Sequence, residues 1–111
     1  NLDIGLEDGC GDKEYLGFLK EAVEKIIREF KPDFAIYLAG ADPYQDDQLG
    51  SLDISLAGLK ERDEFTLRSL YKNNVPVAIV LGGGYACDIE DTVTIHANTV
   101  KSALNLPKIT P

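Results

Sequence analysis

Residues 33–40 read Asp-Phe-Ala-Ile-Tyr-Leu-Ala-Gly, and residues 75–81 read Val-Pro-Val-Ala-Ile-Val-Leu. Both runs are apolar and too short for a helix, so each is predicted to be a buried parallel strand. Pro76 lies at the start of the second run, where a missing backbone donor is tolerated. These runs decide the fold class, because parallel strands need a long crossover connection, usually a helix.

Three amphipathic helices are predicted around the two strands. The first covers residues 12–30, with Asp12 as its N-cap and Lys31-Pro32 as its end. Ser55 and Asp88 are the predicted N-caps of the second and third helices. The side chains expected to form the inner face of the third helix are Ile89, Val93, Ala97, Val100, Ala103 and Leu104. This order predicts an α/β fold with helices over both faces of a parallel sheet.

Composition restricts the possible functions. The chain has 111 residues and a net charge of −8, which argues against direct binding of nucleic acid, since a phosphate backbone needs a positive surface. No apolar stretch approaches the roughly 20 residues of a membrane helix, so no membrane partner is expected. Cys10 and Cys87 have no metal-ligand spacing, and two such thiols favour a reducing cytoplasm. The tail after Leu106 is expected to be mobile.

Loops of unusual composition follow both strands. Ligands of open α/β sheets bind beyond the carboxyl ends of the strands. There the sequence places Asp42 after the first strand, and the run Gly82-Gly83-Gly84 with Tyr85 after the second. If the strands are neighbours, Asp42 and Tyr85 lie on one rim. From the residues alone, Asp42 is either a metal ligand or base, or a residue that caps local amides.

The glycine run and the only histidine also leave alternatives open. The glycines could cradle a phosphate, present Tyr85 to a pocket, or simply form a tight turn. Tyr85 could stabilise an oxyanion or pack over the start of the third helix. His96 falls on the apolar stripe of that helix, so a packed, hydrogen-bonded core residue is favoured over a ligand.

Ordered blocks of residues extend along nearly the whole chain. They are Lys31-Pro-Asp33, Ala39-Gly-Ala-Asp-Pro43, Asp47-Gln-Leu-Gly50, Gly58-Leu59 with Arg62-Asp63, and Leu81-Gly-Gly-Gly-Tyr-Ala86. In this order they resemble the C-terminal part of the histone deacetylase family, especially its bacterial deacetylase-like and acetoin-utilisation types. The resemblance implies a three-layer α/β/α sandwich with a mostly parallel sheet, as in arginases. Residues 1–111 would then be the C-terminal part of a single deacetylase domain, cut from a longer chain.

The resemblance also implies an activity and a role for several residues. The activity is zinc-dependent hydrolysis of the amide of an acetyl-lysine or a similar acylated amine. Asp42 would be one Zn²⁺ ligand, and Tyr85 would hydrogen-bond the scissile carbonyl. Leu49 would line the acyl-lysine tunnel, and the backbone of Gly83 and Gly84 would form part of its wall.

The family's paired histidines and its Asp-x-His block do not occur in the chain. A catalytic zinc ion takes three protein ligands and a water molecule, so one carboxylate is not enough. The missing N-terminal part of the same domain is therefore expected to supply the other ligands, and these 111 residues alone are expected to be inactive. Two alternatives remain: a non-catalytic α/β module that binds a small anionic ligand, and a degenerate deacetylase-like scaffold.

Overall fold

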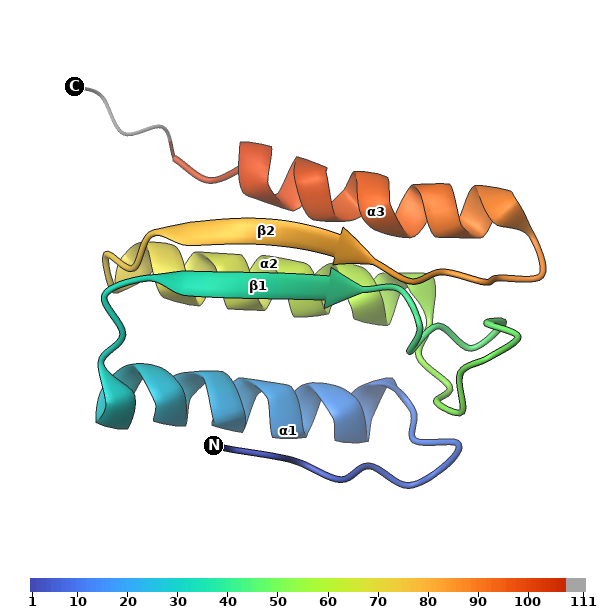
Figure 1. Ribbon diagram of the computed structural model, residues 1–111, viewed down its shortest axis with the longest axis horizontal. Coiled ribbons are helices and arrows are strands. Elements are labelled where there is room, and N and C mark those ends of the chain that lie inside the picture. The colour runs from blue at the N-terminus through green and yellow to red at the C-terminus, as the bar shows by residue number, and fades with distance from the viewer. Residues whose placement is uncertain (108–111) are drawn as a thin grey trace.

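The structure is a computed structural model that describes residues 1–107. The last four residues of the tail predicted to be mobile, 108–111, lie outside the described residues. The elements follow the predicted order (Figure 1). They are α1 (Asp12–Lys25) with a π-helical turn η1 (Ile26–Phe30), β1 (Ala35–Gly40), α2 (Leu56–Lys72), β2 (Val77–Gly82) and α3 (Ile89–Leu104).

The two strands form a parallel pair, as predicted. Ala35 lies opposite Val77 at one end of the register and Gly40 lies opposite Gly82 at the other. The crossover helix α2 lies behind the strands in Figure 1, with α1 and α3 on either side of it. Both outer helices contact α2. The carboxyl ends of both strands therefore meet at one edge of the sheet.

Helices cover only one face of this sheet. Ile36 and Leu38 point to the other face and are 72% and 65% exposed. Val80, in register with Leu38 on β2, is exposed on the same face. The prediction of helices over both faces is therefore wrong for the described residues, because α2 and its two neighbours form a single layer. Parallel sheets are normally covered on both faces, so this apolar face is one that a larger domain would cover.

The buried face of α3 also differs from the prediction. Ile95, Thr99 and Ser102 are buried, whereas Ile89 and Leu104 of the predicted inner stripe are exposed. The reason is a hydrogen bond between helices: the Thr99 hydroxyl donates to Asp63 Oδ2 of α2 at 2.5 Å. This bond turns a partly polar face of α3 inward and leaves much of its most apolar stripe uncovered.

The predicted caps are correct at two of the three helices. Ser55 and Asp88 each accept a first-turn backbone N–H at 3.0 Å. At α1 the N-cap residue is Gly11, not Asp12. The Asp12 carboxylate instead accepts the Ser55 amide at 2.8 Å and the Ser55 hydroxyl, so it joins the starts of α1 and α2.

A buried polar cluster joins β1, α2 and α3. Asp63 is fully buried and accepts hydrogen bonds from the Tyr37 hydroxyl, the Thr99 hydroxyl and Arg62 Nε. Arg62 Nη1 donates to the Gly40 carbonyl at 2.6 Å, at the end of β1. Buried charges are tolerated when they are paired and hydrogen-bonded in this way. The cluster therefore fixes the end of β1 against both helices.

The cluster also keeps its groups in defined protonation states. Burial raises the pKa of the Tyr37 phenol, and the adjacent Asp63 adds to this effect, so Tyr37 stays a neutral donor. Burial acts to lower the pKa of Arg62, but Tyr37 and Asp63 beside it outweigh that effect and raise it. The guanidinium therefore stays charged.

Replacing Asp63 with Ala in the full-length protein tests the cluster. The substitution leaves the buried Arg62 charge and two hydroxyls without their acceptor, so the free energy of unfolding is expected to fall by about 3–5 kcal/mol. Urea denaturation measures the change. Asp53→Ala is the control, because Asp53 is exposed, and a change within about 0.5 kcal/mol is expected there. Equal effects of the two substitutions would contradict a structural role for the cluster.

Among residues 1–107, no helix is both long enough and apolar enough to cross a bilayer.

Candidate functional site

The loops that follow β1 and β2 lie against each other at the carboxyl end of the sheet. The Ala41 amide donates to the Gly82 carbonyl at 3.1 Å, which continues the strand pairing beyond β1. The Gly84 amide then donates to Asp42 Oδ1 at 3.2 Å. Asp42 and the loop that carries Tyr85 are therefore on one rim, as the parallel pairing predicts.

The glycine run allows this close approach. Gly83 and Gly84 have φ values of +67° and +114°, which side-chain-bearing residues rarely adopt. A Cβ atom on Gly83 would lie 2.3 Å from Asp42 Oδ1, and one on Gly84 would lie 2.3 Å from Thr92 Cγ2. The positive φ angles and the lack of room for a Cβ atom thus both require glycine at positions 83 and 84. The run brings backbone up against the Asp42 carboxylate on one side and α3 on the other.

His96 supports the glycine run from α3. Its Nε2 atom lies 3.2 Å from the Gly83 carbonyl oxygen, within hydrogen-bonding distance. The residue is half-buried. The expectation of a hydrogen-bonded histidine is correct, and its partner is the loop that carries the rim rather than a group in the core.

Asp42 is exposed at the rim, and one of its two carboxylate oxygens makes no hydrogen bond within residues 1–107. Oδ1 accepts the Gly84 amide, while Oδ2 has no hydrogen bond within the described part of the chain. No three His, Cys, Asp or Glu side chains among residues 1–107 are grouped so that they could hold a metal ion. Asp42 alone could provide one ligand, whereas a catalytic zinc ion takes three protein ligands.

Leu49 and Tyr85 extend from the same rim into solvent. Their side chains are 74% and 57% exposed. The backbone of this region is nonetheless well fixed: the Gln48 amide donates to the Tyr85 carbonyl at 2.9 Å, and the Cys87 amide donates to the Asp46 carbonyl at 3.0 Å. Two exposed side chains on a fixed backbone can form a wall of a cleft when another element faces them.

Asp47 is a residue of the site to which the sequence analysis assigned no role. It is only 7% exposed and accepts backbone amides from both loops. Its one visible signal was its place at the head of the Asp47-Gln-Leu-Gly50 block. An aspartate before a turn commonly bonds the amides that follow it, but a bond to a second loop has no sequence signature.

A large cavity of the described surface lies away from this rim. A cavity of about 710 Å³ opens at the other end of the sheet, where Lys31 and Asn73 precede the strands. Its lining comes mainly from α1, η1 and α2 and includes the charged residues Glu24, Arg28, Lys31 and Lys72. The rim is the better candidate, because ligands of parallel sheets bind at the carboxyl ends of the strands.

The family profile described as "Histone deacetylase domain" matches residues 1–100. The chain belongs to the histone deacetylase family. It is 42% identical over 82 residues to histone deacetylase 2 of Arabidopsis thaliana, a match that covers 74% of this chain and 21% of that protein. It is 39% identical over 97 residues to an uncharacterized protein of Picosynechococcus sp., covering 87% of this chain and 32% of the relative.

Solved structures of deacetylase-fold proteins match as well. Acetylpolyamine aminohydrolase from Burkholderia pseudomallei superimposes with a TM-score of 0.78 at 20% identity, over 96% of this chain and 29% of that one. The HD domain of HDA15 gives a TM-score of 0.69 at 28% identity, over 89% and 27% of the two chains. The fold is thus the arginase/deacetylase fold in part. This deacetylase-family chain spans about a third or less of the relatives that it matches.

Gly83→Ala in the full-length deacetylase-family protein tests the close approach at the rim. The added methyl group would strain the backbone at φ +67° and displace Asp42, so the protein is expected to lose about 1–3 kcal/mol of stability. Thermal denaturation measures the loss. Gly40→Ala is the matched control, since a Cβ atom there meets no atom within 4 Å in this structure. A Gly83 variant as stable as the Gly40 variant would contradict the argument.

Proposed function

We propose that residues 1–111 are the C-terminal part of a single deacetylase domain, and that the full-length protein hydrolyses the amide of an acetyl-lysine or similar acylated amine. The single observation that carries the proposal is the hydrogen bond from the Gly84 amide to Asp42 Oδ1. This bond joins the acidic loop and the glycine–tyrosine loop of a deacetylase-family chain at one rim.

Each residue of the rim has a role in this proposal. Asp42 is one of three zinc ligands, and its free Oδ2 is available for that purpose. When bound, a zinc ion would polarise the carbonyl of the substrate amide and activate a water molecule for attack. Tyr85 donates its phenolic proton in a hydrogen bond to the oxyanion that develops from the carbonyl. Leu49, with the backbone of Gly83 and Gly84, lines the tunnel that holds the acyl chain.

The remaining part of the domain is the proposed partner of this chain. It would supply a general base and the other two zinc ligands; the described residues contain no group of three side chains that could hold a metal ion. It would also cover the exposed apolar face of the sheet around Ile36 and Leu38. Burying such side chains contributes roughly 1.5–3 kcal/mol each to the packing of the two parts.

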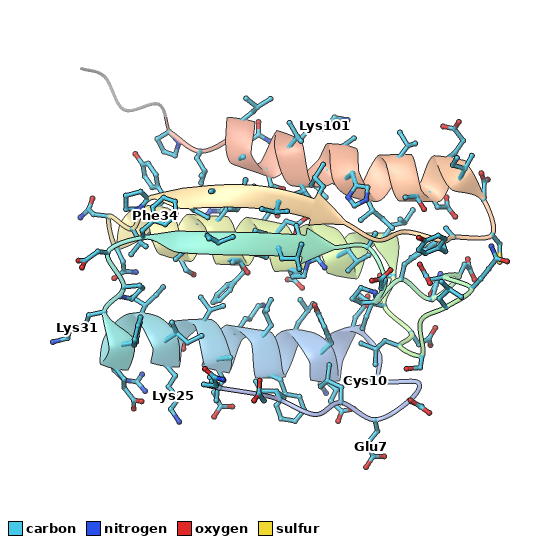
Figure 2. All side chains as sticks on the ribbon, in the orientation of Figure 1. Glu7, Cys10, Lys25, Lys31, Phe34 and Lys101 are labelled. Carbon is cyan, nitrogen blue, oxygen red and sulfur yellow. The ribbon has the colours of Figure 1, made fainter. Side chains whose placement is uncertain are left out.

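We place the protein in the cytoplasm, with neither nucleic acid nor membrane as a direct partner. Cys10 lies just before α1 (Figure 2). It is buried, and burial raises the pKa of its thiol. Cys87 is exposed and unpaired. A reducing compartment is the usual location of proteins that keep such thiols free.

The geometry disfavours the alternative of an anion-binding module. In such a module the amides of the glycine run would point at the ligand. Here the Gly84 amide already donates to the Asp42 carboxylate, whose negative charge would repel a phosphate. A degenerate scaffold is also disfavoured, because such a protein has no need to retain Asp42 and Tyr85 together at the rim.

Two substitutions in the full-length protein separate the proposed roles. Asp42→Ala removes a metal ligand, so zinc is expected to be lost from the purified protein. Tyr85→Phe keeps every ligand but removes an oxyanion donor, so zinc is expected to stay while kcat falls about 10²-fold or more. Metal analysis and steady-state kinetics with an acetylated lysine peptide measure both. Equal loss of zinc in the two variants would refute the assignment.

The isolated chain provides a further test. Because Asp42 is the only proposed zinc ligand within it, the 111-residue protein is expected to bind zinc weakly and to show no measurable deacetylation. The same assay with the full-length protein is the positive control. Robust hydrolysis by the 111-residue chain would show that the proposed division of the site is wrong.

A further inference from the structure

The buried carboxylate of Asp47 lies between the two loops of the rim and contacts both. Oδ1 accepts the backbone amides of Leu49 and Gly50, each at 2.9 Å. Oδ2 accepts the backbone amide of Tyr85 at 2.8 Å. One side chain thus fixes the backbone of a tunnel-lining residue with one oxygen and that of the proposed oxyanion donor with the other.

The hydrogen bonds that Asp47 accepts are stronger than hydrogen bonds between neutral groups. A carboxylate that accepts backbone amides forms charge-assisted hydrogen bonds, roughly twice as strong as neutral ones. Asp47 is 7% exposed, so water competes little for its oxygens. Its three amide donors replace the hydration that burial removes from its charge.

The position of Tyr85 depends on its backbone. Its phenol makes no hydrogen bond within residues 1–107, and its side chain is 57% exposed. The peptide groups of Tyr85 are held on both sides: the amide by Asp47, and the carbonyl by the Gln48 amide at 2.9 Å. Gln48 Nε2 also donates to that carbonyl, at 3.2 Å. The Asp47 carboxylate is the side-chain partner of the Tyr85 amide, so substitution of Asp47 removes that bond without changing the backbone.

We infer that Asp47 is a positioning residue of the deacetylase site, which couples the placement of the Tyr85 phenol to that of Leu49 in the tunnel wall. The inference rests on the proposed function, because it assigns the two residues joined by Asp47 to one reaction. A misplacement of about 1 Å at a reacting group can cost 10²-fold in rate, so a bond that fixes Tyr85 controls kcat.

Asp47→Asn in the full-length protein is expected to remove the hydrogen bond to the Tyr85 amide and to keep those to Leu49 and Gly50. Asparagine keeps one acceptor oxygen, which is expected to face the two donors of Leu49 and Gly50. Its NH₂ group then faces the Tyr85 amide, and two donors cannot bond each other. We expect kcat to fall about 10-fold or more, while KM changes less than about 2-fold and zinc content is unchanged.

Asp47→Ala removes the hydrogen bond to the Tyr85 amide and also those to Leu49 and Gly50. The Leu49–Gly50 turn is then released as well, so KM for an acylated lysine peptide is expected to rise about 5-fold or more, in addition to the fall in kcat. Asp46→Asn is the matched control: it makes the same change of charge at the adjacent residue, which is exposed and does not contact the Tyr85 amide. Its kcat and KM are expected to match those of the wild type.

A double-mutant cycle distinguishes positioning from a general loss of stability. If Asp47 acts through the Tyr85 phenol, Asp47→Asn should cost less than about 2-fold in a protein that already carries Tyr85→Phe. A structural defect would cost the same factor in both backgrounds. Faster hydrogen exchange at the Tyr85 amide in Asp47→Asn, but not in Asp46→Asn, is the expected readout that does not depend on activity.

The outcomes separate this inference from the proposed function. An active wild type in which Asp47→Asn behaves like Asp46→Asn would overturn the positioning role and leave the deacetylase proposal intact. Equal costs of Asp47→Asn with and without the Tyr85 hydroxyl would also overturn it. A full-length wild type with no zinc-dependent deacylation would overturn the proposed function itself.

Discussion

The parallel register of β1 and β2 determines which groups can meet at the rim. Gly40 lies opposite Gly82, so the chains leave the sheet side by side and Asp42 reaches the amide of Gly84. A shift of one residue in either strand would turn every side chain to the other face. Such a shift would also move the carboxylate away from the glycine run. The site thus depends on strand pairing as well as on the conformation of the two loops.

Polar groups inside the helical layer hold β1, one of the two paired strands, in place. Arg62 reaches from α2 to the carbonyl of Gly40, the last residue of β1, and Asp63 beside it holds Tyr37 from the same strand. Each bond has a fixed length and direction, which a purely apolar contact lacks. Replacing a buried ion pair with apolar residues is often neutral for stability, so we read this cluster as a device for alignment. It fixes the last residue of β1, where the Asp42 loop begins.

The elements of the fold could be predicted from the sequence, and their outer contacts could not. Apolar runs and helical periodicity identified both strands and all three helices, since these signals are local. The inward face of α3 was misread, because the bond between Thr99 and Asp63 depends on a helix 36 residues away. The prediction of helices on both faces of the sheet was wrong, because periodicity identifies apolar faces but does not show which residues pack against them.

The candidate site shows the same division between local and distant information. Asp42 and Tyr85 were recognisable because each follows an apolar run predicted to be a strand, and the topology of a parallel pair places such residues on one edge. Asp47 was not, although it contacts both loops, since its bond to Tyr85 spans 38 residues. A buried acceptor between two loops has no periodicity and no required composition. Its role can be recognised only from the hydrogen-bond donors that surround it in the folded structure. Every buried carboxylate needs such donors, because they replace the hydration that burial removes.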